Sequence, residues 1–190
     1  MAENTVKKTT EKATIDCAMV VIKTREAVPV TYGFKSGTKV GVEANIETQE
    51  AVKLIVKGVL IAQKPEKKTL TGHTLTITDS LLIMELLPLC NGGELTKDEQ
   101  QNITGYNAPK VGEEVKKTKF DVTTYSAIME GSDVVGYEAC TYPNCEGQPL
   151  GLGGEDDVFR TQELSIVSAP GSGESAMTMK IVTELPGFEA

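Results

Sequence analysis

His73 is the only histidine in the chain, so any catalytic arrangement that needs an imidazole base must use it. It stands in Thr-Gly-His-Thr-Leu-Thr-Ile, a run typical of a β-strand, and no nucleophile is placed beside it by the sequence. A surface or cross-strand position is the alternative. The sequence favours that alternative, and we predict no general base here.

Cys140 and Cys145 enclose four residues, a spacing at the wide end of zinc-ligand pairs. A structural zinc site needs a second pair, but Cys17 and Cys90 stand alone on separate segments. A Cys140–Cys145 disulfide is the other alternative. In a chain of this size without a secretory signal, we expect reduced thiols that pack as small apolar groups.

The glycine-rich stretch 147–154 could suggest a phosphate-binding loop. It lacks the Lys-Ser/Thr of such loops, and three carboxylates follow it, at Glu155, Asp156 and Asp157. These carboxylates lack the alternating spacing of a calcium loop, so a solvated loop is favoured. No catalytic, metal or cofactor residue is predicted anywhere in the chain, which we expect not to be an enzyme.

The composition points to a soluble, non-catalytic protein. Of the 190 residues, 39% are hydrophobic and 5% aromatic, so the core is thin and the aromatic anchors of a deep pocket are scarce. The net charge of −8 opposes a grip on nucleic acid phosphates. The longest apolar run, 81–89, is far below the roughly 20 residues of a membrane span and contains Glu85, so no membrane anchor is expected.

Alternating apolar and polar residues predict seven or eight strands. Two hairpins are expected: 119–130 with 134–141 across a Gly-Ser-Asp turn, and 159–168 with 176–185 across Pro-Gly-Ser-Gly. Four further strands are predicted in the first half of the chain, at 14–23, 38–48, 51–63 and 69–78.

One helix is predicted at 80–89, with Asp79 as N-cap, Pro88 in the last turn and Asn-Gly-Gly closing it. We expect Leu82 and Leu86 to pack this helix on the sheet. Long loops are predicted at 25–37, 92–117 and 145–157. The expected fold class is mainly β (α+β): a β-sandwich or barrel at 14–186 with one flanking α-helix, a flexible N-terminal arm at 1–13 and a C-terminal tail at 187–190.

A strand ending in Asp79, a compact apolar helix with Glu85, and then Cys90-Asn91-Gly92-Gly93 form the most distinctive segment of the chain. Together with collinear stretches at 30–33, 42–47, 102–106 and 182–186, this segment resembles the tail tube (major tail) proteins of bacteriophages and phage-tail-like particles. The cysteines and the short arm before Thr14 depart from that pattern.

The resemblance implies a subunit that forms hexameric rings, which stack into the hollow tail tube of a virion after synthesis in the cytoplasm of a bacterial host. Its implied partners are copies of itself, a tape-measure protein, tail terminator and baseplate proteins and, in a contractile tail, a sheath. DNA would transit the lumen without specific binding. An acidic wall suits such a conduit because it repels phosphates.

In such tubes a long loop between early strands reaches the adjacent ring, and the matching region here is 25–37. Its apolar residues on a stretch punctuated by Pro and Gly are poorly explained as a solvated loop, and we expect the inter-ring contact to involve Val28, Val30, Tyr32 and Phe34.

Two other functions remain open. A non-enzymatic β-sandwich that binds a host surface or a carbohydrate would also be rich in loops, but the absence of Trp weakens it, since such modules stack sugars on exposed aromatic rings. A hydrolase on a β scaffold ranks third.

Overall fold

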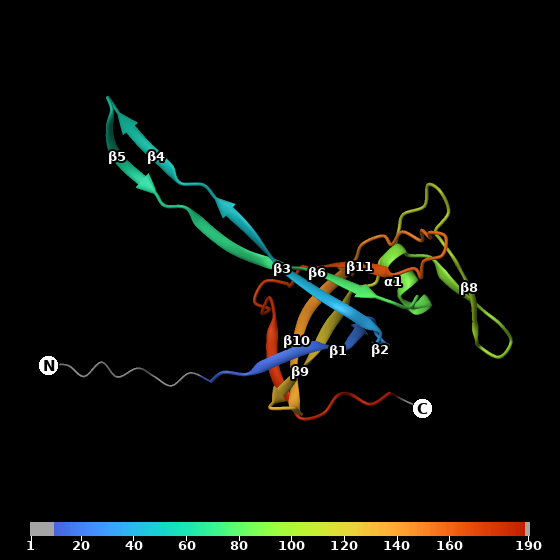
Figure 1. Cartoon of the computed structure of the whole chain (residues 1–190). Coiled ribbons are helices and arrows are strands. Elements are labelled where there is room, and N and C mark those ends of the chain that lie inside the picture. The colour runs from blue at the N-terminus through green and yellow to red at the C-terminus, as the bar shows by residue number, and fades with distance from the viewer. Residues whose placement is uncertain (1–9, 189–190) are drawn as a thin grey trace.

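The computed structural model describes residues 10–188, so most of the predicted N-terminal arm and part of the C-terminal tail lie outside the described residues. No helix in the described part of the chain is long and apolar enough to cross a membrane. The elements, shown in Figure 1, are mostly strands: β1 (Ala13–Thr24), β2 (Thr31–Phe34), β3 (Gly37–Gln49), β4 (Val52–Val56), β5 (Val59–Lys64), β6 (Lys67–Asp79), η1 (Met84–Leu86), α1 (Leu87–Asn91), β7 (Glu94–Lys97), β8 (Ile103–Asn107), β9 (Phe120–Glu130), β10 (Asp133–Gly147), β11 (Gln162–Ser168) and β12 (Thr178–Val182).

The main sheet is antiparallel, with the strand order β2-β1-β9-β10-β11-β6-β3 and with β12 added to β10. β1 and β3, which stand near opposite ends of this order, also contact each other, so the sheet curls around its core. The fold is therefore mainly β with one short helix, as the strand periodicity predicts.

One face of the curled sheet holds the core. Cross-strand partners project to the same face of a sheet, and the rows Val40–Ile77–Leu164 and Leu75–Ile166 place apolar groups inside. The helical segment closes this core with residues of both η1 and α1. Buried members of the core cluster are Val20, Ile22, Phe34, Leu75, Ile77, Leu86, Leu89, Cys90, Phe120, Val122, Tyr142, Cys145, Leu164 and Ile166.

The helix differs from the expectation for 80–89. It begins with a 3₁₀ turn at Met84 and becomes α-helical only at Leu87, so Pro88 lies in the first turn of α1 rather than in the last turn of a longer helix. A proline ring clashes with the carbonyl four residues earlier, here that of Met84, which prevents a continuous α-helix through this point.

Asp79 is not a helix N-cap. It ends β6 fully buried, where its carboxylate accepts hydrogen bonds from the Ser36 hydroxyl (2.8 Å) and from the Leu81 backbone N–H (2.8 Å). The side chain therefore ties the segment that precedes β3 to the turn that leaves β6.

The first predicted hairpin is confirmed, with Glu130 opposite Asp133 across the tight turn between β9 and β10. The second hairpin prediction is wrong. β11 pairs with β10 and β6, whereas β12 pairs with β10 alone. Both strands lie along the same edge of β10, one on each side of the irregularity between Tyr142 and Cys145. Turn residues at 170–173 thus connect consecutive strands that do not pair with each other.

Segment 51–63 is a hairpin rather than one strand. Its turn residues Lys57 and Gly58 both have positive φ, 48° and 81°, as the two-residue turns that match strand twist require. The predicted loops also contain ordered pieces: β2 lies within 25–37, the β7–β8 hairpin lies within 92–117, and β10 extends to Gly147.

Candidate assembly surfaces

Chemistry-bearing side chains are scattered in this fold. No group of three or more His, Cys, Asp or Glu residues within 10–188 could hold a metal ion. His73 packs edge-on against Tyr142, with 5.4 Å between ring centroids. Burial raises the pKa of the Cys90, Cys140 and Cys145 thiols to about 11. At neutral pH these thiols carry almost no nucleophilic thiolate.

A long hairpin projects from the body of the molecule. β3 and β6 stay paired as far as Gln49 and Lys67, and β4 and β5 continue the ladder outward as a separate two-stranded sheet. Figure 1 shows it extending well beyond the main sheet, and every residue from 46 to 71 is exposed. We call residues 47–69 the arm.

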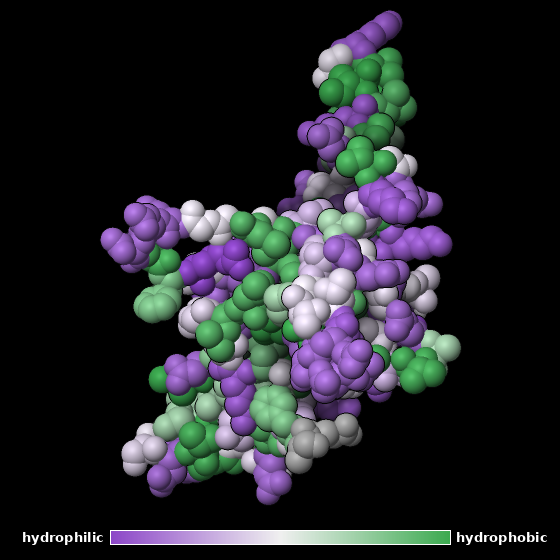
Figure 2. All heavy atoms as spheres, turned by 90° about the vertical axis from the view of Figure 1, so that its right-hand side faces the viewer, coloured by the Kyte–Doolittle hydropathy of each residue, from purple (hydrophilic) through white to green (hydrophobic). Residues whose placement is uncertain are grey.

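The arm is unusually apolar for a segment surrounded by solvent. Figure 2 shows hydrophobic residues covering much of it below a hydrophilic tip. Exposed clusters of this kind mark interaction sites. Its large aliphatic side chains are between 48% and 64% exposed: Val52, Leu54, Ile55, Val56, Val59, Leu60 and Ile61.

The arm also differs in charge from the rest of the chain. Residues 51–64 contain Lys53, Lys57 and Lys64 and neither Asp nor Glu, which gives a net charge of +3. The other 176 residues hold the remaining 16 Lys and Arg and all 27 Asp and Glu, a net charge of −11. We call residues 51–64 the arm tip, and this cationic tip is attached to a chain that is anionic elsewhere.

The outer face of the main sheet, which points away from the core, is divided into two halves. On β3, β6 and β11 it is polar, with the cross-strand rows Lys39–Thr78–Glu163, Gly41–Thr76–Ser165 and Glu43–Thr74–Val167. On β1, β9, β10 and β12 it is apolar at the end next to the β9–β10 turn, with the rows Ala13–Met129–Val134 and Ile15–Ala127–Tyr137–Val182. Farther along the same strands, Thr123, Thr141 and Thr178 form a polar row. We call the apolar end of these four strands the apolar sheet face.

A groove of about 620 Å³ continues the apolar sheet face toward β2. Its walls come from β1, from the β1–β2 connection and from the chain that follows β12, including Met19, Val30, Gly33 and Phe188. A Cβ added at Gly33 would lie 2.9 Å from Met19 Cε and 3.1 Å from Phe188 Cε1, so a larger residue here would displace the flexible end of the Met19 side chain. Lys35 Nζ lies 5.3 Å from the Phe188 ring centroid.

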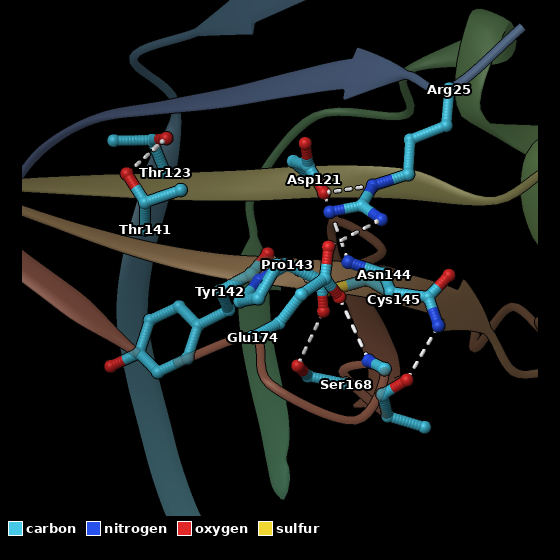
Figure 3. Close-up of polar contacts among 12 residues, drawn as sticks. Arg25, Asp121, Thr123, Thr141, Tyr142, Pro143, Asn144, Cys145, Ser168 and Glu174 are labelled. Atoms are coloured by element: carbon cyan, nitrogen blue, oxygen red, sulfur yellow. Dashed lines mark hydrogen bonds and ion pairs between the residues drawn. The ribbon is translucent and has the colours of Figure 1, made fainter. Parts of the chain in front are cut away.

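A polar network fixes the connection between β11 and β12 (Figure 3). Arg25 Nε donates to Asp121 Oδ1 at 2.6 Å and Arg25 Nη1 donates to Glu174 Oε1 at 3.3 Å. Asp121 Oδ1 also accepts from the backbone N–H of Asn144, whose φ is +50°. Hydrogen bonds to Asp121 hold the pKa of Arg25 above its usual value. The network secures the start of the segment that carries β12.

The predicted contact residues of loop 25–37 do not share one surface. Val28 is 79% exposed and Val30 42% exposed, whereas Phe34 is buried in the core and Tyr32 packs against it. The Phe34 side chain is therefore unavailable to a neighbouring subunit in this structure. An inter-ring role for Val28 and Val30 stays a prediction.

The helix residues also divide. Leu86 is 1% exposed and belongs to the core, whereas Leu82 precedes the helix and is 39% exposed. The arm was not singled out from the sequence as a functional segment. Its signal is present in the sequence, since residues 51–64 contain seven large aliphatic residues around a Lys-Gly turn, together with three lysines and no acidic residue.

Fold and surfaces together define a mainly β protein that exposes apolar groups on an arm, at one end of a sheet face and at loop positions such as Val28 and Phe159. No protein-family model matches the sequence, and no curated protein matches it. Among solved structures, the anti-feeding prophage cap (AFP tube terminating cap), determined by cryo-EM, superposes with a TM-score of 0.45 and 12% sequence identity, covering 96% of this chain and 100% of that chain. A likeness of this size defines neither fold nor function.

Proposed function

We propose that the chain is a non-enzymatic structural subunit that assembles with copies of itself into the tail tube of a phage or phage-tail-like particle. The arm is the observation that carries this proposal. A two-stranded hairpin is at best marginally stable by itself in water, and this one exposes seven large aliphatic side chains. Burial against another protein would stabilise it by roughly 25 cal/mol for each Å² of apolar surface covered.

Open strand edges support assembly as well. β3 and β12 each pair on one side only within the described sheet, so each presents unpaired backbone groups along its other side. Such edges are templates for pairing with another chain, and closing a ring of subunits removes them. Hexameric rings that stack into a hollow tube are the arrangement implied by the resemblance at 72–93 and its collinear stretches.

The net charge fits a conduit. Outside the arm tip the chain carries −11, and a lumen lined by such a surface would let DNA pass without being condensed on it. In this proposal the tape-measure protein occupies the lumen during assembly, and tail terminator and baseplate proteins bind the two ends. A sheath would surround the tube if the tail is contractile.

Replacing residues 50–66 with Asn-Gly tests the proposal. Gln49 and Lys67 are already cross-strand partners, so a two-residue turn can close the hairpin there without altering the register of β3 and β6. We expect unchanged cooperative thermal unfolding and loss of tubes in negative-stain electron microscopy, because the deleted residues make no contact with the core.

The matched control is deletion of residues 152–156, which are also exposed but lie in the loop between β10 and β11. This variant should fold and assemble like the wild type. If the wild-type protein stays monomeric at every concentration and salt condition tried, the proposal fails. Normal tubes from the variant without the arm would show that the arm is not the assembly element.

A further inference from the structure

The outer face of the main sheet is unusual in being apolar at one end, on β1, β9, β10 and β12. An antiparallel sheet with one face on its core normally presents polar side chains on the other, as β3, β6 and β11 do here. On the apolar sheet face, Ile15 is 51% exposed and Val134 50% exposed, and they lie on successive cross-strand rows with Met129 and Tyr137. The described chain leaves this end of the sheet face without a full cover.

The arm is apolar on both of its sides. Leu54 lies opposite Ala62 and Ile55 lies opposite Leu60, and because successive residues point to opposite faces, each face of the hairpin carries large aliphatic groups. A two-stranded ribbon of this kind can bury one face on a sheet and leave the other for further contact. It fits an apolar sheet face better than a deep pocket.

Charges around the two surfaces are complementary. The arm tip carries Lys53, Lys57 and Lys64 without any acid. At the apolar sheet face, Asp16, at the irregularity in β1, and Glu130 and Asp133, at the β9–β10 turn, are all exposed. The basic residues near these acids are Lys12, directly before β1, and Lys180, in β12, so acids outnumber bases here. Such complementarity fixes the register of a contact and disfavours contacts between like surfaces.

The two surfaces lie at different ends of the molecule. In Figure 1 the arm leaves the body toward the upper left, while the β9–β10 turn lies at the bottom. An arm so directed points away from the apolar sheet face of its own chain. A contact between two different surfaces of identical subunits is heterologous, and when its geometry does not close on itself it continues into an open series.

Resting on the proposed function, we propose that the arm of one copy lies on the apolar sheet face of a second copy, with the lysines of the arm against the acids at the β9–β10 end. The occupant of this face is thus a second copy of the chain. The polar half of the same outer face, on β3, β6 and β11, remains exposed to solvent.

Two complementary variants test the pairing. An arm variant, Leu54→Asp with Leu60→Asp, has a defective arm and an intact sheet face. A face variant, Ile15→Lys with Val134→Lys, has an intact arm and places lysines where the arm lysines would approach. All four positions are about half exposed, so both variants should unfold at wild-type temperatures. Each variant alone should lose arm-dependent association by at least about tenfold in analytical ultracentrifugation.

Mixing the two variants gives the decisive result. The intact arm of the face variant can bind the intact sheet face of the arm variant. No further copy can be added through the arm, because the remaining arm and the remaining sheet face are both defective. We expect the equimolar mixture to form species joined by a single arm contact, pairs of monomers or pairs of rings, and no long tubes. The matched control is Thr78→Lys with Ser165→Lys, on the polar half, which should assemble like the wild type.

Three outcomes would overturn the pairing. The first is that the wild type assembles but the mixed variants do not associate. The proposed function would then stand, but the arm would bind a surface other than the apolar sheet face. The second is a face variant that assembles normally. The third is arm-dependent binding of the wild type to vesicles of phosphatidylglycerol and phosphatidylcholine in place of self-association, which would make a lipid surface the partner of the arm.

Discussion

Leu82 and Leu86 are only four residues apart in the sequence but differ in burial. Both belong to an apolar run that predicts a helix, but only Leu86 enters the core, because the chain becomes helical only from Met84 onward. Deleting the side chain of a buried leucine removes its transfer free energy and leaves a cavity.

We therefore predict that Leu86→Ala lowers the free energy of unfolding by about 2–5 kcal/mol. Leu82→Ala, at a position 39% exposed, should cost less than about 1 kcal/mol. Urea denaturation followed by circular dichroism measures both. Equal losses in the two variants would mean that Leu82 is packed as firmly as Leu86, contrary to the structure.

At the scale of elements, β2 makes part of the connection between β1 and β3 a strand rather than a loop, which changes the effect expected from deleting it. Residues 31–34 form a strand on β1, and Phe34 is buried in the core cluster. Only the connection before β2 is a loop, and it is closed by hydrogen bonds between Thr24 and Val30. Removing the whole stretch would take away part of the sheet and a core aromatic ring.

Deletion of residues 26–36 is therefore predicted to destabilise the subunit by at least about 3–5 kcal/mol, the usual loss for a buried Phe alone. Val28→Asp, at a position 79% exposed, should leave the thermal unfolding temperature unchanged within error. Electron microscopy of Val28→Asp then tests the inter-ring contact separately from folding. Normal tubes from this variant would remove Val28 from the assembly surface.

At the scale of the whole molecule, the core contains several groups that resist ionisation. Burial raises the pKa of Cys90, Cys140 and Cys145 from 9.0 to about 11, and that of Tyr142 from 10.0 to about 12. A group whose pKa is raised on folding stabilises the folded state fully below its unfolded pKa, and this contribution disappears as the pH rises through the folded pKa.

Stability should consequently be nearly constant from pH 7 to about 8.5 and fall progressively between about pH 9 and 11. The midpoint of urea unfolding, measured at fixed ionic strength across this range, is the test. Cys90→Ala removes one of the contributing groups and should make the decline shallower. A midpoint that rises above pH 9 would contradict the assigned burial of these side chains.

Local pattern was sufficient for much of the fold. Alternation of apolar and polar residues identifies β1, β3, β6 and β9, because a strand with one buried face must repeat every second residue. The tight turn at 131–132 likewise determines that β9 and β10 pair, since a short connection leaves neighbouring strands little choice.

Only the tertiary structure decided which distant strands became neighbours. β12 follows β11 in the chain but pairs with β10, because that edge of β10 is free beyond the irregularity at Tyr142 and Cys145. Pairing of this kind depends on which edge is open and which face is already buried, and neither is encoded in a short window of sequence.

The same reason explains the surfaces. Apolar residues at 51–63 predict a strand, and the structure alone shows that they form a hairpin that extends past the body and leaves them exposed. Phe34 in turn became a core residue because β2 adds to β1. Sequence by itself determined many of the strands and their buried faces, while the curl of the sheet decided which apolar side chains were buried within the chain and which remained exposed.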